Sequence, residues 1–325
     1  MKVLRFENPG RDYCLVVADA PVPQPGPGQV LIQVTAAGLN RADLLQGRGL
    51  YPPPPGAPDI PGMEVSGTIA ALGPDVTDLT MGQPVCALMA GGGYARMALA
   101  DAGSVLALPK GVDLAEAAGL PEACFTAWTN IVDTGRLADG ESLLVHGGTS
   151  GIGVMAIQMF AALGHRVFAT AGSDGKCTAC RELGAARAIN YRTEDFVAAV
   201  MDATGGKGVD VILDMVGGDY VQRNIAAAAP WGRIVNIAYQ NGARTQVDFT
   251  PVLLKKLTLA ATTLRGRTPA QKQHIRDALA ARVWPLIAAG RIRPVTARRF
   301  AFDAANEAHA AMAQGGHIGK ILLEL

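Results

Sequence analysis

The sequence predicts an α/β protein with two domains, a doubly wound parallel sheet and a second, β-rich domain. From residue 142 to about 262, short β-rich runs alternate with helical patterns, as they do when parallel strands are joined by right-handed crossovers. Residues 1–120 instead hold short strands separated by turns rich in Pro and Gly. The length of 325 residues is about twice that of one typical domain, so each domain has room for a core.

The N-terminal region is expected to form a compact β unit. The chain after Arg298 supplies a strand, a helix that ends at Gly315-Gly316, and a last strand. We expect this tail to pack back onto the N-terminal unit, so that residues 1–121 and 264–325 form one discontinuous domain and residues 122–263 the other. The strand candidates of the β unit are QVLIQVTAAG, EVSGTIAALG, QPVCALMA and the terminal KILLEL.

The middle region is predicted to be a Rossmann domain. Helices are expected up to Leu163, up to the LGA at residues 183–185, over residues 196–203 and after Asp219. A long amphipathic helix over residues 269–289 is predicted to follow. The strand candidates are LLV, RVFAT, RAIN, VDVILDM, GRIVNIA and LTLAAT.

Composition favours a small-molecule enzyme of the cytoplasm. The 29 Lys and Arg residues nearly balance 28 Asp and Glu, so no basic excess indicates a nucleic-acid or membrane partner. The start has no apolar signal core, and no apolar run approaches the ~20 residues of a membrane span. The five cysteines are scattered and are interpreted as reduced thiols. Cys177 and Cys180 form a C-x-x-C on what we expect to be a surface helix, without a second pair for zinc.

A glycine-rich turn follows the first strand of the Rossmann region. The segment HGGTSGIGV has the order G-x-x-G-x-G, which is a weaker signal than G-x-G-x-x-G, and the alternative is a tight turn. Glycines let the backbone approach a ligand, and the first N–H groups of the next helix favour an anion. The expected cofactor-binding residues of this turn are Gly148, Ser150, Gly151, Ile152 and Gly153.

The second strand of the region indicates which nicotinamide cofactor binds. In NAD-binding Rossmann domains a carboxylate at its tip accepts a hydrogen bond from the ribose 2′-hydroxyl. The tip here, FATAGSDGK, offers Ser173 and Lys176 to a 2′-phosphate, so we predict NADPH rather than NADH. Asp174 is the objection, although it is also placed to cap the next helix. Tyr191 either closes the same pocket or is an ordinary edge tyrosine.

The segment from Ala36 to Gly73, with its N-R-x-D and G-x-Y-P-P-P runs, resembles the medium-chain dehydrogenase/reductases, and among them the zinc-free quinone oxidoreductase branch. The resemblance continues through GGGYARMALA, LPEACFTAWTNI, the glycine turn and GGHIGKILLEL, so it covers nearly the whole chain. It implies a GroES-like domain packed on a Rossmann domain, NADPH in the cleft between them, and hydride transfer to quinones or related activated carbonyls.

The resemblance also allows a test for zinc. In the zinc-dependent relatives a Cys, a His in a G-H-E motif and a later Cys hold a catalytic metal, and here Asn40, Met63 and Glu122 stand at those positions. Three good protein ligands are needed, and a thioether is a poor zinc ligand. No four-cysteine lobe for structural zinc is present either. We therefore expect no metal and a substrate that needs little polarisation, such as a quinone.

The resemblance implies roles for further residues. Asn40 and Tyr51 are expected near the substrate, with Asp43 as a supporting polar group; the alternatives are a turn residue, a packing tyrosine and a helix-start carboxylate. Thr126 corresponds to a threonine beside the nicotinamide, or else packs its helix. Lys320 resembles a position near the cofactor phosphates, or is a solvated lysine. At the carboxyl ends of the later strands, where such sheets bind ligands, we expect Val216, Ile237, Tyr239 and Leu264.

Two other functions remain open. A 2-alkenal or enoyl reductase of the same superfamily would also transfer hydride without metal. An NADPH-binding protein with little catalysis, acting as a redox sensor or as a structural or RNA-binding protein, is the alternative from another class. We also expect a homodimer that pairs through an edge strand of the Rossmann sheet, either GRIVNIA or LTLAATTL.

Overall fold

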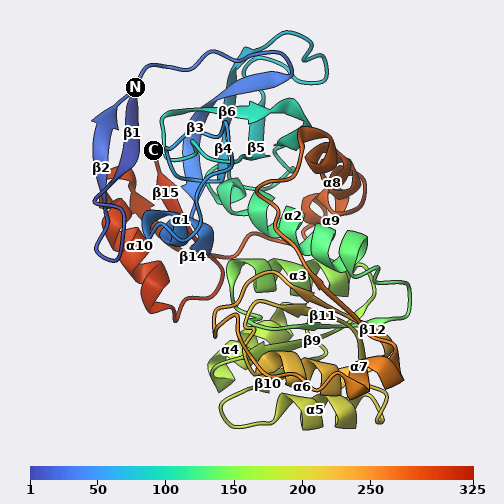
Figure 1. The fold of residues 1–325 in the computed structure, drawn as a ribbon. Coiled ribbons are helices and arrows are strands. Elements are labelled where there is room, and N and C mark those ends of the chain that lie inside the picture. Colours follow the sequence, from blue (N-terminus) through green and yellow to red (C-terminus); the bar gives the residue numbers. More distant parts are fainter. The chain divides into compact units, whose positions relative to one another are not determined.

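The computed structural model describes all 325 residues, and the chain folds as two compact units (Figure 1). The β-rich unit comprises Met1–Phe125 and Arg265–Leu325, and the parallel-sheet unit comprises Thr126–Leu264. These boundaries lie a few residues from the predicted ones. No helix combines the length and apolarity needed to cross a membrane.

The parallel-sheet unit has the strand order β10-β9-β8-β11-β12-β13, with every neighbouring pair parallel. This is the order of a doubly wound Rossmann sheet, and the direction of winding reverses between β8 and β11. The predicted fold class is confirmed. The strands are β8 (Ser142–Val145), β9 (Arg166–Ala171), β10 (Arg187–Asn190), β11 (Val209–Asp214), β12 (Ala228–Asn236) and β13 (Thr258–Ala261), and the helices are α3 (Gly151–Ala162), α4 (Asp174–Glu182), α5 (Phe196–Ala203), α6 (Tyr220–Ala227) and α7 (Thr250–Lys255).

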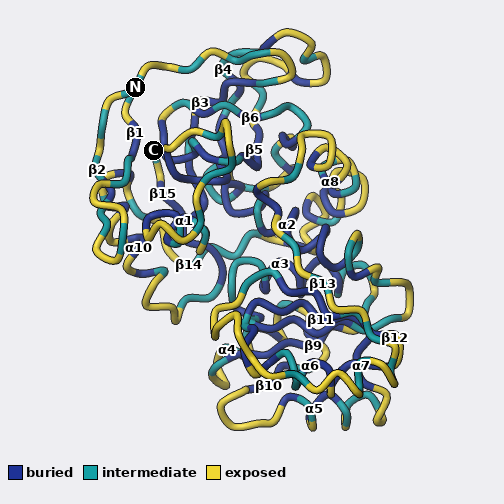
Figure 2. The backbone as a smooth tube through the Cα atoms, in the orientation of Figure 1, coloured by how far each residue is buried: buried dark blue, intermediate teal, exposed yellow.

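The central strands of this sheet are almost fully buried, as Figure 2 shows for β9 and β11. Parallel strands covered by helices on both faces are apolar along their whole length, and this explains the uninterrupted apolar runs of the sequence. Leu144, Phe168, Ile212 and Ile234 belong to the resulting core. The edge strand β13 differs, because most of its residues are exposed.

The β-rich unit contains a sheet of order β14-β15-β3-β4-β5-β7, with β6 also paired to β3, and a separate β1-β2 pair. The last strand β15 pairs antiparallel with β3, where Leu323 lies opposite Ala37, so the tail returns to the N-terminal sheet. The strands are β1 (Lys2–Glu7), β2 (Cys14–Asp19), β3 (Gln29–Gly38), β4 (Glu64–Leu72), β5 (Pro84–Leu88), β6 (Met97–Asp101), β7 (Val105–Ala107), β14 (Thr296–Ala301) and β15 (Lys320–Glu324).

Most helices of the β-rich unit are short. One helix, α2, crosses the boundary between the units and is followed by a π-helical turn, η3 (Thr129–Thr134). The helices are α1 (Arg41–Gly47), α2 (Pro121–Trp128), α8 (Pro269–Arg282), α9 (Trp284–Ala288) and α10 (Ala305–Gln314), and the 3-10 turns are η1 (Ala102–Ser104), η2 (Glu116–Gly119) and η4 (Phe302–Ala304).

One expectation about helices was wrong. The single helix predicted over residues 269–289 is divided into α8 and α9, because Pro285 lacks the N–H that would continue the hydrogen-bond ladder. The helix α4, which carries Cys177 and Cys180, lies at the surface as expected, and the two cysteines are buried on its inner face. The Sγ atom of Cys180 packs so closely on Gly148 that a Cβ added there would lie 2.8 Å from it.

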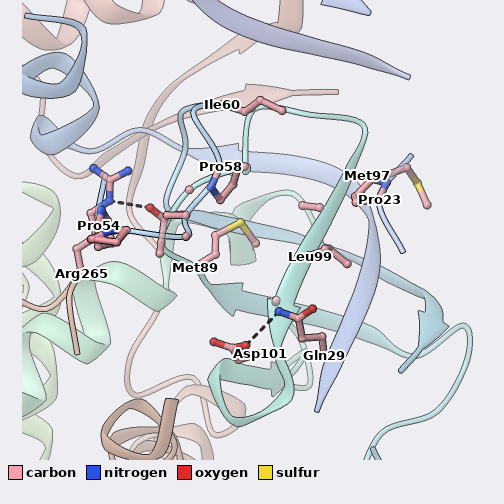
Figure 3. A pocket seen from close by; sticks show the side chains of 18 of the residues that line it. Pro23, Gln29, Pro54, Pro58, Ile60, Met89, Met97, Leu99, Asp101 and Arg265 are labelled. Atoms are coloured by element: carbon pink, nitrogen blue, oxygen red, sulfur yellow. Dashed lines mark hydrogen bonds between the residues drawn. The ribbon is translucent and has the colours of Figure 1, made fainter. Parts of the chain in front are cut away.

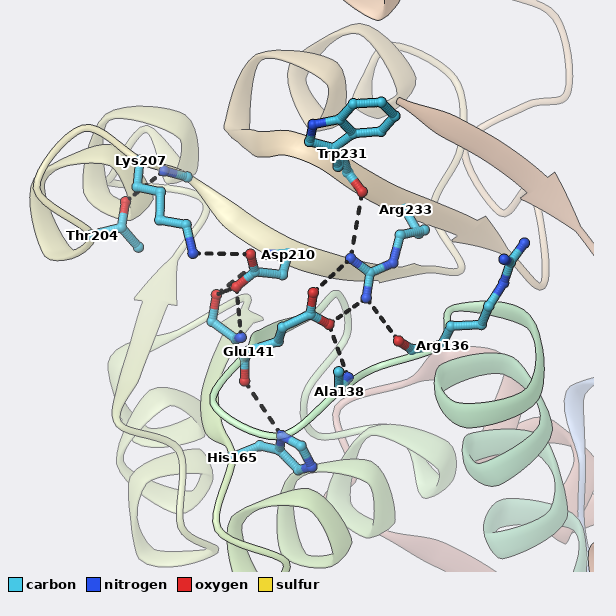
Figure 4. Close-up of polar contacts among 11 residues, drawn as sticks. Arg136, Ala138, Glu141, His165, Thr204, Lys207, Asp210, Trp231 and Arg233 are labelled. Atoms are coloured by element: carbon cyan, nitrogen blue, oxygen red, sulfur yellow. Dashed lines mark hydrogen bonds and ion pairs between the residues drawn. The ribbon is translucent and has the colours of Figure 1, made fainter. Parts of the chain in front are cut away.

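A polar network ties the amino ends of the central strands together (Figure 4). Glu141, just before β8, forms an ion pair with Arg233 on β12, and Arg233 also donates to the carbonyl oxygens of Gly135 and Arg136. Asp210 on β11 accepts hydrogen bonds from the backbone N–H and hydroxyl of Ser142, both at 2.8 Å. These contacts hold the end of the sheet opposite the glycine turn.

The ion pair predicts a pH-dependent stability. Burial acts to raise the pKa of Glu141, but hydrogen bonds from Arg233 and from the N–H of Ala138 hold it below its ordinary value of 4.5. The pair therefore stabilises the fold above that pH and ceases to do so as the carboxylate is protonated. We expect Glu141→Gln to lower the free energy of unfolding by about 1–2 kcal/mol at pH 7, and by less as the pH falls below 4.5.

Urea unfolding of both proteins between pH 7 and pH 3 measures this difference. Glu182→Gln, an exposed carboxylate at the end of α4, is the control. A loss of stability in Glu141→Gln that is equally large at pH 3 would contradict the electrostatic explanation.

Candidate active site

The glycine turn between β8 and α3 is built as an anion site. Ser150 is the N-cap of α3, and its Oγ accepts a hydrogen bond of 3.0 Å from the N–H of Gly153. Gly153 must be glycine, since a Cβ there would lie 2.3 Å from the carbonyl oxygen of Gly147. The N–H groups of Gly151 and Ile152 are the donors that the first helical turn leaves unpaired. Together with the helix dipole they favour a phosphate at this position.

The tip of β9 carries the groups expected to distinguish the two cofactors. Ser173 is the N-cap of α4, and its Oγ accepts from the N–H of Lys176 at 3.3 Å. Asp174 is not the cap, because its Oδ1 accepts a hydrogen bond of 2.7 Å from Asn190 at the end of β10. The Tyr191 side chain is 42% exposed, and its hydroxyl lies against Gly172, where an added Cβ would be 2.6 Å away. Tyr191 therefore lies beside the tip, as the pocket hypothesis requires.

A buried carboxylate, Asp214, organises the loop after β11. Its Oδ1 accepts from the N–H of Val216 at 2.7 Å, and its Oδ2 accepts from the side-chain amides of Asn224 at 3.0 Å and Asn236 at 2.8 Å. Asn224 in turn contacts the imidazole of His146 at 2.7 Å. A buried charge with this many donors is satisfied without a cation. His146 is thus part of this buried hydrogen-bond network.

Ile237, Tyr239 and Leu264 follow the carboxyl ends of strands, whereas Thr126 lies in a helix. Ile237 follows β12 directly, and Tyr239 packs on Gly217, where a Cβ would lie 2.6 Å from its ring. Leu264 follows β13 and is buried. Thr126 lies in α2 and is also buried. The side chains at this edge of the sheet are therefore drawn from the loops after β8, β9, β10, β11, β12 and β13.

A buried ion pair lies at the centre of the predicted site in the β-rich unit. The ammonium of Lys320, the first residue of β15, contacts the carboxylate of Glu64 on β4 at 2.6 Å. It also donates to the carbonyl oxygen of Leu39 at 2.6 Å and to Oδ1 of Asn40 at 2.7 Å. Asn40 donates from Nδ2 to Glu64 at 2.9 Å and to the carbonyl oxygen of Gly38 at 3.3 Å.

These contacts disagree with the role expected for Lys320. An ammonium has three donors, and all three have acceptors within the β-rich unit, so none is left for a cofactor phosphate. The lysine is 6% exposed and is not a solvated residue either. The structure makes Lys320 a positioning residue that holds the carboxamide of Asn40. Asn40 is also the N-cap of α1, as the turn alternative for this residue requires.

Asp43, in the first turn of α1, holds the backbone of Asn40. Its Oδ2 accepts from the backbone N–H of Asn40 at 2.8 Å and from the hydroxyl of Tyr94 at 3.1 Å. That hydroxyl lies 3.4 Å from His309, which contacts the Tyr13 hydroxyl at 2.9 Å. Burial raises the pKa of Asp43 to about 6, against the opposing hydrogen bonds. Asp43 is fully buried and acts by fixing Asn40.

Tyr51 is held by an arginine that the sequence analysis did not single out. Arg265 donates from its Nη1 to the carbonyl oxygen of Tyr51 at 3.4 Å, and its guanidinium carbon lies 5.6 Å from the centre of the Tyr51 ring. It also donates to Gln46 and to the carbonyl oxygen of Ala90, both at 2.7 Å. Burial raises the pKa of the Tyr51 hydroxyl. Tyr51 therefore presents a neutral hydroxyl and a fixed ring.

Sequence reasoning missed Glu64, Asp214 and Arg265. Each offered the same weak signal, a charged residue beside or within an apolar strand: Glu64 at the start of EVSGTIAAL, Asp214 at the end of VDVILD and Arg265 soon after TLAA. A charged residue there must find a buried partner. The sequence does not say which partner it finds.

Comparison with known families and structures agrees with this architecture. Residues 26–110 match the family described as alcohol dehydrogenase GroES-like domain, and residues 151–281 match the family described as zinc-binding dehydrogenase. The chain belongs to the medium-chain dehydrogenase/reductase superfamily. The family predicted from the sequence motifs, its quinone oxidoreductase branch, is confirmed.

The similar proteins fall into two groups. The chain is 29% identical to the quinone oxidoreductase of Homo sapiens, over 100% of this chain and 98% of that one. It is 30% identical, over 99% of its length, to a mycocerosic acid synthase-like polyketide synthase of Mycolicibacterium smegmatis, but it spans only 15% of the length of that protein. Among solved structures, an Escherichia coli quinone oxidoreductase complexed with NADPH superimposes with a TM-score of 0.86 at 26% identity, covering 100% of this chain and 99% of that chain.

The Lys320–Glu64 pair predicts a large and coupled effect on stability. We expect Lys320→Met to lower the free energy of unfolding by about 3–5 kcal/mol, because it leaves a buried carboxylate unpaired. Adding Glu64→Gln removes that charge, so the double variant should lose less stability than the two single losses summed. Thermal and urea unfolding of the three variants measure the coupling, and strictly additive losses would contradict it.

Proposed function

We propose that this protein is an oxidoreductase that uses NADPH to reduce quinones without zinc. The observation that carries the proposal is that the ammonium of Lys320 contacts both Asn40, which stands at one of the relatives' zinc positions, and Glu64. The glycine turn for a dinucleotide is nevertheless complete. A site organised in this way holds a polar segment rigid but provides no Lewis acid. Its substrate must therefore already be electron-poor.

The parallel-sheet unit has groups that fit NADPH. The bound cofactor would supply the hydride. The N–H groups of Gly151 and Ile152 suit its pyrophosphate, and Ser173 and Lys176 suit a 2′-phosphate. Lys176 is available for this contact, because its side chain forms no hydrogen bond or ion pair with the protein. The carboxylate nearest the β9 tip, Asp174, is held toward β10 by a hydrogen bond from Asn190 to its Oδ1.

The residues at the relatives' zinc positions do not fit a zinc ion. Oδ1 of Asn40 already accepts from Lys320, and an ammonium next to a divalent cation is strongly unfavourable. Met63 is buried and offers only a thioether. No three His, Cys, Asp or Glu side chains gather anywhere in the structure as a metal site would need.

A quinone matches what the β-rich unit offers. Its carbonyls are conjugated and accept electrons with little polarisation, so positioning is the main requirement. The ring of Tyr51, fixed by Arg265, provides a flat surface for a planar acceptor. Its hydroxyl, kept protonated by burial, can donate to a developing oxyanion.

The second candidate function is reduction of an activated carbon–carbon double bond. Two solved structures favour it: a 2-haloacrylate reductase with a TM-score of 0.81 at 28% identity and a CurK enoyl reductase with a TM-score of 0.84 at 26% identity. An enone or enoyl thioester also accepts hydride without a metal, so only the acceptor distinguishes the two functions.

A steady-state assay with a simple benzoquinone and with a 2-alkenal, each with NADPH and with NADH, tests the proposal. We expect quinone-dependent oxidation of NADPH that survives a metal chelator and a lower rate with NADH. Preference for the enal would replace the quinone by the second candidate. NADPH binding without turnover of either acceptor would favour the sensor hypothesis.

The same assay tests the cofactor residues. Lys176→Ala should lower kcat/KM for NADPH about tenfold or more while leaving that for NADH nearly unchanged, because one charge-assisted contact to the 2′-phosphate is lost. Arg181→Ala, a cation on the same helix that hydrogen-bonds to Thr178 at 2.8 Å, is the matched control. Equal losses with both cofactors would contradict the assigned role of Lys176.

We also propose that two copies pair through the edge of the parallel sheet. The edge strand β13 has only β12 as a neighbour, and α7 packs beside it on β12. Large apolar side chains are exposed around this edge: Trp231 is 65% exposed, Phe249 61%, Leu253 77% and Leu254 71%. An open edge strand next to an apolar patch is a typical association surface.

This proposal predicts that Leu253→Asp weakens or abolishes a dimer without unfolding the chain. The reason is that a charge would be buried at an apolar interface. Met81→Asp, at a residue 60% exposed in the β-rich unit, is the control and should remain dimeric. Light scattering coupled to gel filtration measures the mass, and a monomeric wild-type protein at micromolar concentration would refute the proposal.

A further inference from the structure

The β-rich unit contains a cavity of about 690 Å³ that none of the predicted site residues line (Figure 3). Its wall is formed by the proline loop at residues 54–58, by residues 89–92, by β6, by residues 20–23 and by the segment from Arg265 to Lys272. This volume is within the range of small-molecule pockets, about 300–1,000 Å³. Asn40, Asp43 and Tyr51 lie outside it.

Most of the wall is apolar and rigid. Figure 3 shows Pro58, Ile60, Met89, Met97 and Leu99 around the space. The prolines restrict the loop on one side. The glycines opposite them allow close packing: a Cβ at residue 91 would lie 2.9 Å from a carbonyl oxygen of the proline loop. Such a surface suits the body of an apolar ligand.

The polar part of the wall carries unbalanced positive charge. Lys272 is 5% exposed and Arg265 is 6% exposed, yet neither forms an ion pair. Lys272 contacts only the carbonyl oxygen of Arg265, at 3.2 Å, so two of its three donors have no acceptor. Burial lowers the pKa of both side chains. Buried charges in proteins are normally paired, and these are not.

No carboxylate forms an ion pair with either cation, although Asp101 and Glu122 act on Lys272, and Asp43 and Glu122 on Arg265, at longer range. Asp101 lines the cavity, but it accepts from Gln29 at 3.4 Å and makes no ion pair with a cation of the wall. Arg5 is already paired with Asp59. Arg267, also in the wall, has no hydrogen bond or ion pair. The cavity thus has an excess of cations of which two are shielded from water.

We propose that this cavity binds an organic anion of moderate size, with its acidic group at Lys272 and Arg265 and its apolar body on the proline and methionine wall. A carboxylate or phosphate there would accept from the two unused donors of Lys272 and from the remaining N–H groups of Arg265. It would also supply the counter-charge that the buried cations lack.

The proposal is independent of the hydride-transfer reaction. It requires neither cofactor nor quinone, and it concerns a different part of the β-rich unit. Arg265 nevertheless connects the two places, since its guanidinium also donates to the carbonyl oxygen of Tyr51. An anion that binds the remaining N–H groups of Arg265 would therefore share this arginine with Tyr51.

Calorimetric titration of the whole protein with decanoate, decyl phosphate and 1-decanol tests the proposal. The three probes share one apolar chain and differ in charge. We expect at least one of the two anions to bind about tenfold or more tightly than the alcohol, because a charge-assisted contact replaces a neutral one. The two anions distinguish a carboxylate site from a phosphate site.

Three variants locate the binding. Lys272→Met should remove the preference for the anion, Lys272→Arg should keep it, and Leu99→Trp should weaken anion and alcohol alike by filling the cavity. Thermal melts identify any variant that does not fold, and the wild-type selectivity and Lys272→Arg remain informative in that case. Equal binding of anions and alcohol by the wild type, or anion binding unaffected by both Lys272→Met and Leu99→Trp, would overturn the proposal.

Discussion

The β-rich unit depends on one buried ion pair, between Lys320 and Glu64. A pair taken out of water is stable only when every remaining donor and acceptor is satisfied, and here the carbonyl oxygen of Leu39, the carboxamide of Asn40 and the N–H of Glu122 complete the set. This requirement joins the last strand, β4, the start of α1 and the start of α2 at one point. Asn40 has no freedom to rotate as a consequence. The start of α1, which follows Asn40 in the chain, is therefore held in one position.

The parallel-sheet unit also contains a buried carboxylate whose hydrogen-bonding capacity is filled, but here no cation is paired with it. Asp214 has no cation beside it, and its carboxylate is neutralised by backbone N–H groups and two asparagine amides. The loop after β11 is thereby fixed where an open α/β sheet binds its ligand. In both units a buried polar group with complete hydrogen bonding supports residues that would touch cofactor or substrate. None of these supporting groups needs to touch the ligand itself.

The buried cations of the β-rich unit fall into two kinds. Lys320 has all three donors occupied and a carboxylate in contact, so it is part of the framework. Lys272 has one neutral acceptor, and Arg265 has only neutral acceptors. Cationic side chains of similar burial thus differ in whether their charge and their hydrogen-bond donors are matched by a partner. This contrast separates Lys320, which is part of the framework, from Lys272, which keeps two donors unused.

The sequence by itself determined the order and type of the elements, because strand and helix periodicity and turn residues act over a few neighbouring positions. The helix predicted over residues 196–203 is α5, and the six predicted strands of the Rossmann region are all present. The glycine turn was also identified, since its spacing is local. Only the tertiary structure decided which face of α4 is buried, and that Lys320 meets Asn40 across 280 residues of chain. A side chain's partners depend on which distant strands pair, and no local pattern contains that information.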